Sequence, residues 1–179
     1  MKQSNRGFTL LELIISLSVI VLLVTVALPN FQGIMQRNRV TTKLNEILTA
    51  MNLARSEAIT GGVVAGACPS LDGVNCDDNR WDVGWIVWVD ENANSAFDAN
   101  EVARVNNLAA AGSDGQLQVF AQNNIRNGIS FSPLGVPIQG ASFLLLRERD
   151  LGVNVHIHVS PAGRLESHCF PRAASCKQF

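Results

Sequence analysis

The chain has 179 residues and a formal net charge of −1, and only 16% of its residues are charged while 47% are hydrophobic. This charge balance argues neither for nor against nucleic-acid binding. No phosphate-binding glycine loop and no nucleophile-elbow serine is found, and there are only three histidines, so the sequence offers no recognisable enzyme site.

A long apolar segment begins close to the N-terminus and ends at Leu28. Its only polar interruptions between residues 13 and 28 are Ser16, Ser18 and Thr25. A helix that rises about 1.5 Å per residue covers roughly 30 Å from Phe8 to Leu28, which is enough to span a bilayer. Because basic residues but no acid precede the segment, its N-terminus should stay in the cytoplasm. We therefore predict a single transmembrane helix over residues 8–29 in the inner membrane, followed by a periplasmic domain.

Two residues in this segment are unusual for a membrane helix. Glu12 places a carboxylate early in the apolar run, and such a group is a functional-site hypothesis because it needs a cationic partner. Pro29 removes a backbone donor, so it should kink or locally melt the helix.

The sequence Gly-Phe-Thr-Leu-Leu-Glu-Leu at residues 7–13 resembles the processing site of type IV pilins and type II secretion pseudopilins. An ordinary secretory signal is cleaved after its apolar core, whereas here the glycine precedes the core. The resemblance implies that residues 1–7 are a leader removed by a prepilin peptidase between Gly7 and Phe8, and that Phe8 is then N-methylated. It also implies that Glu12 pairs with the N-terminal amine of a neighbouring subunit, and a proline such as Pro29 is common in these helices.

Residues 30–61 are predicted to continue the helix as a periplasmic stem. Apolar residues three and four positions apart form one helical stripe. They are Val40, Leu44, Ile47, Leu48, Met51, Ala54 and Ala58. Gly61 and Gly62 supply the residues that end a helix. The stripe must be covered by the rest of the chain.

Residues 62–179 alternate between strand patterns and turn signals, as in an antiparallel β domain. The predicted strands cover residues 63–65, 81–89, 102–108, 116–121, 128–131, 141–147 and 153–159. We therefore predict an α+β fold in which a long N-terminal transmembrane and stem helix packs on an antiparallel β-sheet domain.

Three later segments resemble the FimT/FimU and GspH class of minor pilins. They are Gly-Trp-Ile-Val-Trp-Val-Asp at 84–90, Phe-Ser-Pro-Leu-Gly at 131–135 and Ser-Pro-Ala-Gly-Arg at 160–164. The resemblance implies a low-copy subunit near the tip of a type IV pilus or of a type II secretion pseudopilus, where it helps to start assembly. The implied partners are other minor and major pilins, the prepilin peptidase and the inner-membrane assembly platform. Both the pilus and the secretion interpretation stay open.

All four cysteines follow the apolar segment, and an even number in the oxidising periplasm indicates disulfides. Three connectivities are possible. We expect the local one, Cys68 with Cys76 and Cys169 with Cys176, because short loops close at low entropic cost.

The acidic run at residues 90–101 matches the spacing of oxygen ligands 1, 3, 5, 9 and 12 of a calcium loop. The matching residues are Asp90, Asn92, Asn94, Asp98 and Glu101. Ser95 stands where such a loop needs glycine. The segment before the loop has a strand pattern, whereas a helix precedes such a calcium loop. A polar hairpin loop is the alternative, since Asn and Asp favour turns for their own reasons. No other cofactor is expected.

His156 and His158 alternate on one predicted strand, with His168 and Cys169 further along the chain. A zinc site is one interpretation. The other is a polar strand face whose opposite side carries Val155, Ile157 and Val159, because structural zinc needs four well-spaced ligands.

The C-terminal region raises a possible role in DNA uptake. Some FimT-like minor pilins bind DNA through a Gly-Arg-x-Arg motif, but here Gly163-Arg164 is followed by Leu165 and Glu166. Arg172 and Lys177 lie further on, and residues 147–179 hold five basic against three acidic residues. Each phosphate contact needs a cation, and Arg164, Arg172 and Lys177 could supply it. DNA binding by these residues is therefore one interpretation. The other is that Arg164 is a turn residue with a purely structural role.

Overall fold

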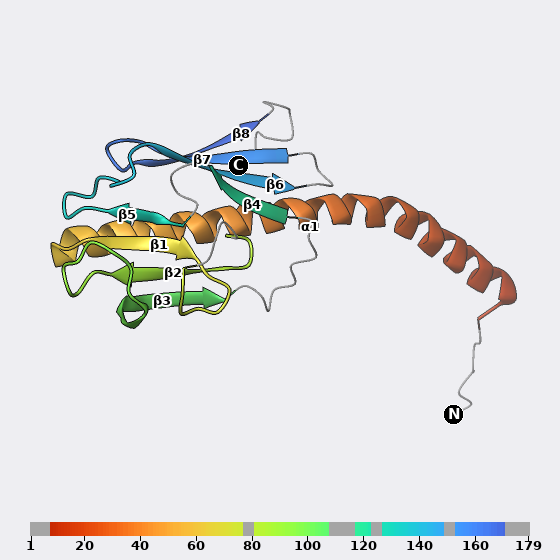
Figure 1. The fold of residues 1–179 in the computed structure, drawn as a ribbon. Helices are drawn as coiled ribbons and strands as arrows, with labels where there is room; N and C mark the ends of the chain where they lie inside the picture. Colours follow the sequence, from red (N-terminus) through yellow and green to blue (C-terminus); the bar gives the residue numbers. More distant parts are fainter. Residues whose placement is uncertain (1–7, 77–80, 108–116, 123–126, 149–152, 171–179) are drawn as a thin grey trace. The chain divides into compact units, whose positions relative to one another are not determined.

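The structure is a computed structural model of the chain, and it describes residues 8–76, 81–107, 117–122, 127–148 and 153–170 (Figure 1). Its elements are α1 (Leu10–Gly61), β1 (Ala65–Pro69), β2 (Gly84–Val89), the 3-10 turn η1 (Ala99–Glu101), β3 (Val102–Asn107), β4 (Leu117–Gln122), β5 (Ile129–Phe131), β6 (Ser142–Glu148), β7 (Val153–Val159) and β8 (Leu165–Phe170). The chain forms two compact units, residues 1–39 and 40–179, and each is described by itself.

The first unit contains the N-terminal part of α1. Thr9 caps the helix, because its side-chain oxygen accepts a hydrogen bond from the backbone N–H of Glu12 at 3.2 Å. Ser18 donates its hydroxyl to the carbonyl of Ile14 at 2.8 Å, so this polar side chain is satisfied inside its own helix. The helical assignment is unbroken at Pro29, so the structure shows no local melting there. No helix in the described part of the chain meets the length and apolarity that crossing a membrane requires.

In the second unit, the residues of α1 from Val40 onward bury one stripe. Ile47, Met51 and Ala54 are fully buried, and the polar positions between them are exposed or half-buried. This is the stripe that the spacing of three and four residues predicts. Gly62 follows the last helical residue with a φ of +65°, the left-handed conformation in which a helix commonly terminates.

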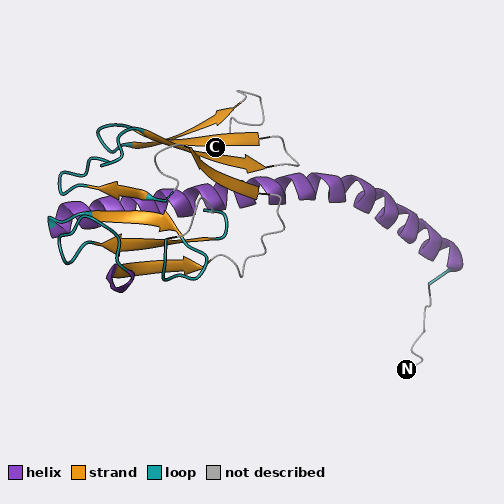
Figure 2. Cartoon of the chain, viewed as in Figure 1, coloured by secondary structure: helices purple, strands orange, loops and turns teal. Residues whose placement is uncertain are grey.

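The strands form two antiparallel four-stranded sheets, seen as two groups of arrows in Figure 2. The first sheet has the order β3-β2-β1-β5 and the second the order β4-β6-β7-β8. The sequence predicted the antiparallel pairing but no division into two sheets, and it missed β8. The observed β1 also begins later than predicted and includes Cys68, and the predicted strand from Trp81 starts only at Gly84.

One hydrophobic core joins the stripe of α1 to both sheets. The first sheet contributes residues such as Ala67 and Val87, and the second contributes Leu144 and Ile157. The opposite face of the first sheet is also buried, because β1 and β2 are covered on both sides. A second apolar cluster lies there, formed by Cys68, Ile86 and Trp88 with Val64, Cys76, Phe97 and Val102.

Two matching turns bring the sheets together on α1. Residues 132–135 and 160–163 both read Ser-Pro-x-Gly, and in each turn the glycine N–H donates to the serine carbonyl at 2.8 Å. The Arg55 side chain donates to the carbonyl of Gly135 at 2.8 Å and to that of Ala162 at 3.4 Å. Spacing along the helix alone favours a solvated charge at Arg55, and this expectation is wrong, because the two carbonyls that Arg55 binds lie 80 and 107 residues further along the chain.

Candidate functional site: the N-terminal segment and the loops over the first sheet

The processing motif is placed by the structure only in part. Gly7 lies outside the described residues, and Phe8 is 84% exposed just before α1 begins. Glu12 sits in the first turn of α1 and is exposed. Among the described residues its carboxylate has no hydrogen-bond or ion-pair partner.

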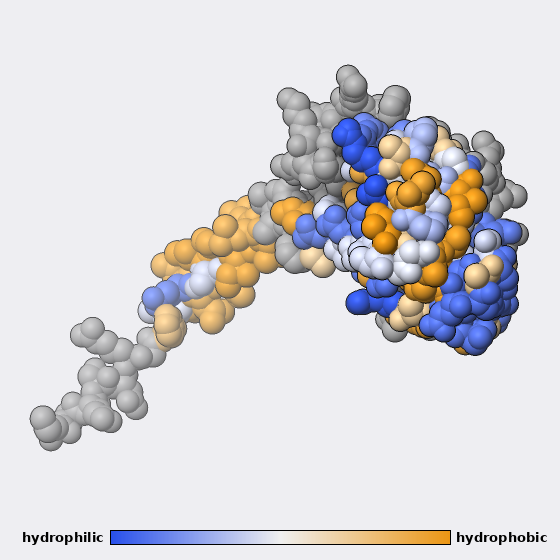
Figure 3. Space-filling model, turned by 90° about the vertical axis from the view of Figure 1, so that its left-hand side faces the viewer, coloured by the Kyte–Doolittle hydropathy of each residue, from blue (hydrophilic) through white to orange (hydrophobic). Residues whose placement is uncertain are grey.

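Apolar side chains around Glu12 are exposed along the helix. Every large hydrophobic residue of the segment from Phe8 to Val24 is at least 45% exposed. Figure 3 shows this part of α1 as a surface dominated by the hydrophobic colour. An exposed apolar surface of this extent indicates a contact with another molecule or with lipid.

The first of two loops over the outer face of the first sheet is closed by a disulfide. Cys68 and Cys76 are bonded, with their Cα atoms 5.5 Å apart. Inside the loop, Asp72 accepts hydrogen bonds from the backbone N–H groups of Asn75 and Val74, both at 2.8 Å. These donors favour the ionised form and hold the pKa of Asp72 well below its usual range. The side chain of Cys169 and the whole of Cys176 lie outside the described residues, so their pairing stays a prediction.

The second loop, residues 90–101, contains the five residues of the predicted calcium loop. The Asp90 carboxylate accepts hydrogen bonds from the N–H groups of Asn94 at 3.1 Å and Ser95 at 2.8 Å. The Glu101 carboxylate accepts from the N–H groups of Glu91 at 3.1 Å and Asn92 at 3.3 Å. The two carboxylates therefore hold the backbone of the loop from its two ends.

The Asp98 carboxylate is the third acidic group in this loop. One of its oxygens accepts hydrogen bonds from the side-chain amides of Asn92 at 2.6 Å and Asn94 at 2.8 Å. The structure thus brings all five predicted residues into one hydrogen-bonded loop. Phe97 anchors the loop to the sheet, because its ring meets the Trp88 ring edge-on with centroids 6.0 Å apart.

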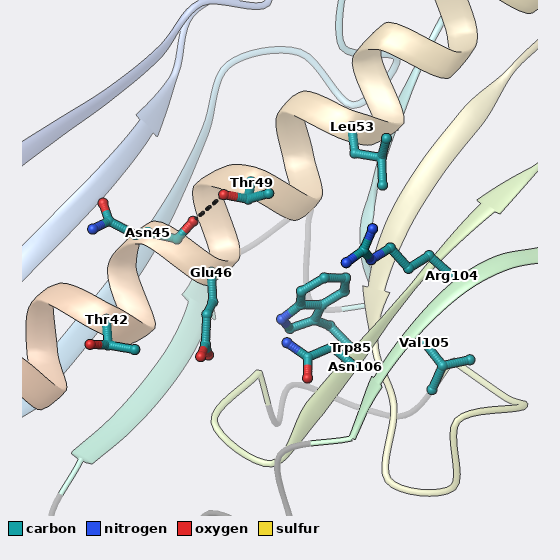
Figure 4. A pocket seen from close by; sticks show the side chains of 9 residues that line it. All are labelled: Thr42, Asn45, Glu46, Thr49, Leu53, Trp85, Arg104, Val105 and Asn106. Atoms are coloured by element: carbon teal, nitrogen blue, oxygen red, sulfur yellow. Dashed lines mark hydrogen bonds between the residues drawn. The ribbon is translucent and has the colours of Figure 1, made fainter.

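A groove between α1 and strands β2 and β3 was not anticipated from the sequence (Figure 4). Its lining residues are Thr42, Asn45, Glu46, Thr49, Leu53, Trp85, Arg104, Val105 and Asn106. Next to it, Lys43 donates to the carbonyl of Asp82 at 3.2 Å and lies 3.7 Å from a Glu46 oxygen. Burial lowers the pKa of Lys43, although the nearby carboxylates oppose this shift.

The histidines lie on the outer side of the second sheet. His156 and His158 are half-buried, while Val155 and Ile157 between and beside them are buried in the core. His156 is registered opposite His168 on β8. Within the described residues, no three His, Cys, Asp or Glu side chains are grouped so that they could hold a metal ion.

Arg164, the candidate DNA contact, is engaged with the glutamate that replaces the second arginine. Its Nε lies 3.0 Å from a Glu166 oxygen, and the other Glu166 oxygen is 3.4 Å from His168. This ion pair is exposed, so it adds little stability, but it neutralises the arginine locally. Arg172 and Lys177 lie outside the described residues.

Near its N-terminus the chain has an exposed apolar helical segment that carries a glutamate in its first turn, and the later part of the same helix packs an apolar stripe on antiparallel sheets. These features define the type IV pilin-like class of minor pilins and pseudopilins. Residues 43–163 match the family model of the type II transport protein GspH, and residues 2–28 match that of the prokaryotic N-terminal methylation motif. The chain belongs to the GspH family. The proteins of this family are structural subunits, and its methylation motif implies a membrane-anchored pilin.

Two curated relatives match part of the chain, and solved structures share its fold. Two fimbrial proteins of Pseudomonas aeruginosa are each 32% identical over 85 residues, which cover 46% of this chain and 50% of theirs. The chain thus spans about half the length of these curated relatives. Two crystal forms of the type IV minor pilin FimU of Pseudomonas aeruginosa share the fold at 17% and 16% identity. Their TM-scores are 0.56 and 0.52, and the matches cover 74% and 72% of this chain and 90% and 91% of theirs.

Proposed function

We propose that this protein is a minor pilin of a type IV pilus that takes part in initiating the pilus and in forming its tip. A prepilin peptidase cleaves between Gly7 and Phe8, and Phe8 becomes N-methylated. Before assembly the subunit is held in the inner membrane by residues 8–29, with its N-terminus in the cytoplasm and residues 62–179 in the periplasm. Its partners are other minor and major pilins and the inner-membrane assembly platform.

The observation that carries this proposal is the exposed apolar helix with one acid in its first turn. The large apolar residues from Phe8 to Val24 are at least 45% exposed, so their burial is available for packing against other helices. The Glu12 carboxylate has no hydrogen-bond or ion-pair partner among the described residues. Once this surface is buried in a bundle, the carboxylate requires a cation, and the N-terminal amine of a neighbouring Phe8 is of the right charge. This pairing fixes the axial position of one subunit against the next.

A type II secretion pseudopilin is the second candidate, because the family model that matches residues 43–163 is named after a type II transport protein. The relatives at 32% identity are fimbrial proteins, and this favours the pilus. Binding of DNA for natural transformation is a third candidate. It is the least supported, since the Arg164 guanidinium already faces the Glu166 carboxylate at 3.0 Å.

The proposal is tested by replacing Glu12 in the native host. We expect Glu12→Ala to leave membrane insertion intact and to reduce the amount of the subunit in sheared pili at least about tenfold, since an unpaired charge is a large penalty in an apolar bundle. The matched control is Ser18→Ala, which removes a hydroxyl that only serves its own helix. Normal incorporation of Glu12→Ala would contradict the proposal.

The site of processing and the choice of system need separate measurements. Mass spectrometry of the mature chain should find N-methylated Phe8 at its start, and a bulky replacement of Gly7 should retain the leader. Deletion of the gene should abolish or reduce surface pili while leaving type II secretion unchanged. The reverse result would assign the chain to a secretion pseudopilus.

A further inference from the structure

The loop between β2 and β3 carries a concentrated negative charge. Residues 90–101 contain four acidic residues and no basic one. Two of these acids are withdrawn from solvent, since Asp90 is 1% exposed and Glu101 is 4% exposed. Burying a carboxylate costs stability unless hydrogen bonds or a positive charge offset the loss of solvation.

Glu101 has one satisfied and one unsatisfied oxygen. Its Oε1 accepts the two hydrogen bonds from the N–H groups of Glu91 and Asn92. Its Oε2 is buried and has no hydrogen-bond partner. Because both oxygens belong to one carboxylate and Oε1 is fixed to the loop backbone, Oε2 is held at the same loop. A buried carboxylate oxygen without a donor is the type of group that a cation satisfies.

Other oxygen atoms of the loop are gathered by the same network. Asp98 is tied to the middle of the loop sequence by hydrogen bonds from the Asn92 and Asn94 side chains. Asp90 is fixed at the opposite end by the N–H groups of Asn94 and Ser95. The acidic side chains of the loop are therefore hydrogen-bonded to its own backbone and amide groups.

Two features of the sequence spoke against a calcium loop of the helix-flanked type, and the strand before the loop is indeed observed as β2. The other feature, a serine in place of glycine, is compensated by the backbone conformation. Ser95 stands at the position that calls for glycine, yet it has a φ of +60°, in the left-handed region that a glycine would supply. The serine thus makes the turn, at some cost in strain.

The chemistry of these groups selects the type of ion. The loop has no histidine or cysteine, so it lacks the ligands that zinc prefers. In the described residues no three carboxylate, imidazole or thiol groups come together as metal ligands, so an ion here would have at most two carboxylates and would take its other ligands from amide or carbonyl oxygens and water. Calcium accepts such a set in flexible geometry, whereas magnesium demands a near-ideal octahedron.

We propose that the loop of residues 90–101 binds one calcium ion, with Glu101 Oε2 and the Asp98 carboxylate as its charged ligands. The ion offsets the charge of the loop and satisfies the buried oxygen. Because the same loop packs Phe97 on Trp88 over the outer face of the first sheet, calcium also stabilises this face of the second unit.

The test is a calorimetric titration of the purified, chelator-treated full chain with calcium chloride, together with its thermal unfolding. We expect one site per chain with a dissociation constant of about 0.1–1 mM or tighter and a higher unfolding temperature in calcium than in the same concentration of magnesium. Absence of binding at about 10 mM calcium, far above that range, would overturn the proposal. So would an equal response to magnesium.

Three variants locate the ion. Glu101→Gln keeps an oxygen for the two backbone donors but removes the charge, so calcium affinity should fall at least about tenfold. Asp98→Asn, at a half-buried position, should show a similar loss without risk to the core. Glu91→Gln is the matched control, because it removes the same charge from an exposed side chain of the same loop and should keep affinity within about threefold. If all three variants lose affinity equally, the effect is one of diffuse charge and the proposed site is wrong.

Discussion

The two ends of α1 use apolar residues in different ways. Between Phe8 and Val24 the large hydrophobic side chains are exposed, whereas Ile47 and Met51 are fully buried. The first segment is apolar nearly all round, while the second is apolar on one stripe that matches two sheets of the same chain. The first segment therefore leaves its apolar surface exposed, whereas the apolar stripe of the second segment is covered by the sheets of its own unit.

The sharpest test of this difference truncates one apolar side chain in each segment. Ile47→Ala should lower the free energy of unfolding of the second unit by about 2–5 kcal/mol, since it leaves a cavity in a closed core. Leu17→Ala removes a side chain that is 53% exposed, so it should change the free energy of unfolding of the second unit by less than about 0.5 kcal/mol. Denaturant titration followed by tryptophan fluorescence measures both, because all three tryptophans lie between residues 81 and 88. Equal losses would show that the first segment also belongs to the folding unit.

A smaller effect is expected where the two Ser-Pro-x-Gly turns meet. Gly163 has a φ of +77°, and a Cβ there would approach the carbonyl oxygen of Gly135 to 2.1 Å. Gly163→Ala should therefore lower the free energy of unfolding by more than the roughly 1–2 kcal/mol that the left-handed conformation alone costs.

Gly140→Ala supplies the control for this prediction. Gly140 has nearly the same φ, +76°, but a Cβ there meets nothing within 4 Å. The difference between the two variants, read from the same denaturant titration, isolates the packing of the turns on each other. If the two variants lose equal stability, the close contact between the turns contributes nothing.

The smallest effect is expected at the surface of the disulfide loop. Because hydrogen bonds lower the pKa of Asp72 below 3.8, they stabilise the fold above that pH. This contribution is lost as the pH falls further, through the pKa of the folded state. An NMR titration of the Asp72 carboxyl should show a midpoint below 3.8, and Asn75→Ala, which removes a side-chain donor at 2.8 Å, should raise it. A midpoint at or above 3.8 in the unmodified chain would contradict this account.

The periodic spacing of apolar residues explains how much of the fold could be predicted from the sequence. The stripe of α1 follows from residues spaced three and four apart, and most strands follow from their alternation and from recurring turn residues. The full burial of Val155 and Ile157 and the only partial burial of their neighbours His156 and His158 also follow from the period of two. The missed strand β8 carries Glu166 and His168, and its polar composition gave a weak strand signal.

The sequence by itself determined the local features: the processing motif, the apolar segment with Glu12, the buried stripe, and the short loop between Cys68 and Cys76. Each depends on residues close together in the chain, where spacing and side-chain chemistry suffice. Only the tertiary structure decided that the strands form two sheets, that Arg55 binds two turns from different sheets, and that Glu101 buries an oxygen without a hydrogen-bond partner. These features depend on which distant segments meet, and this is set by the packing of the whole core and not by any local pattern.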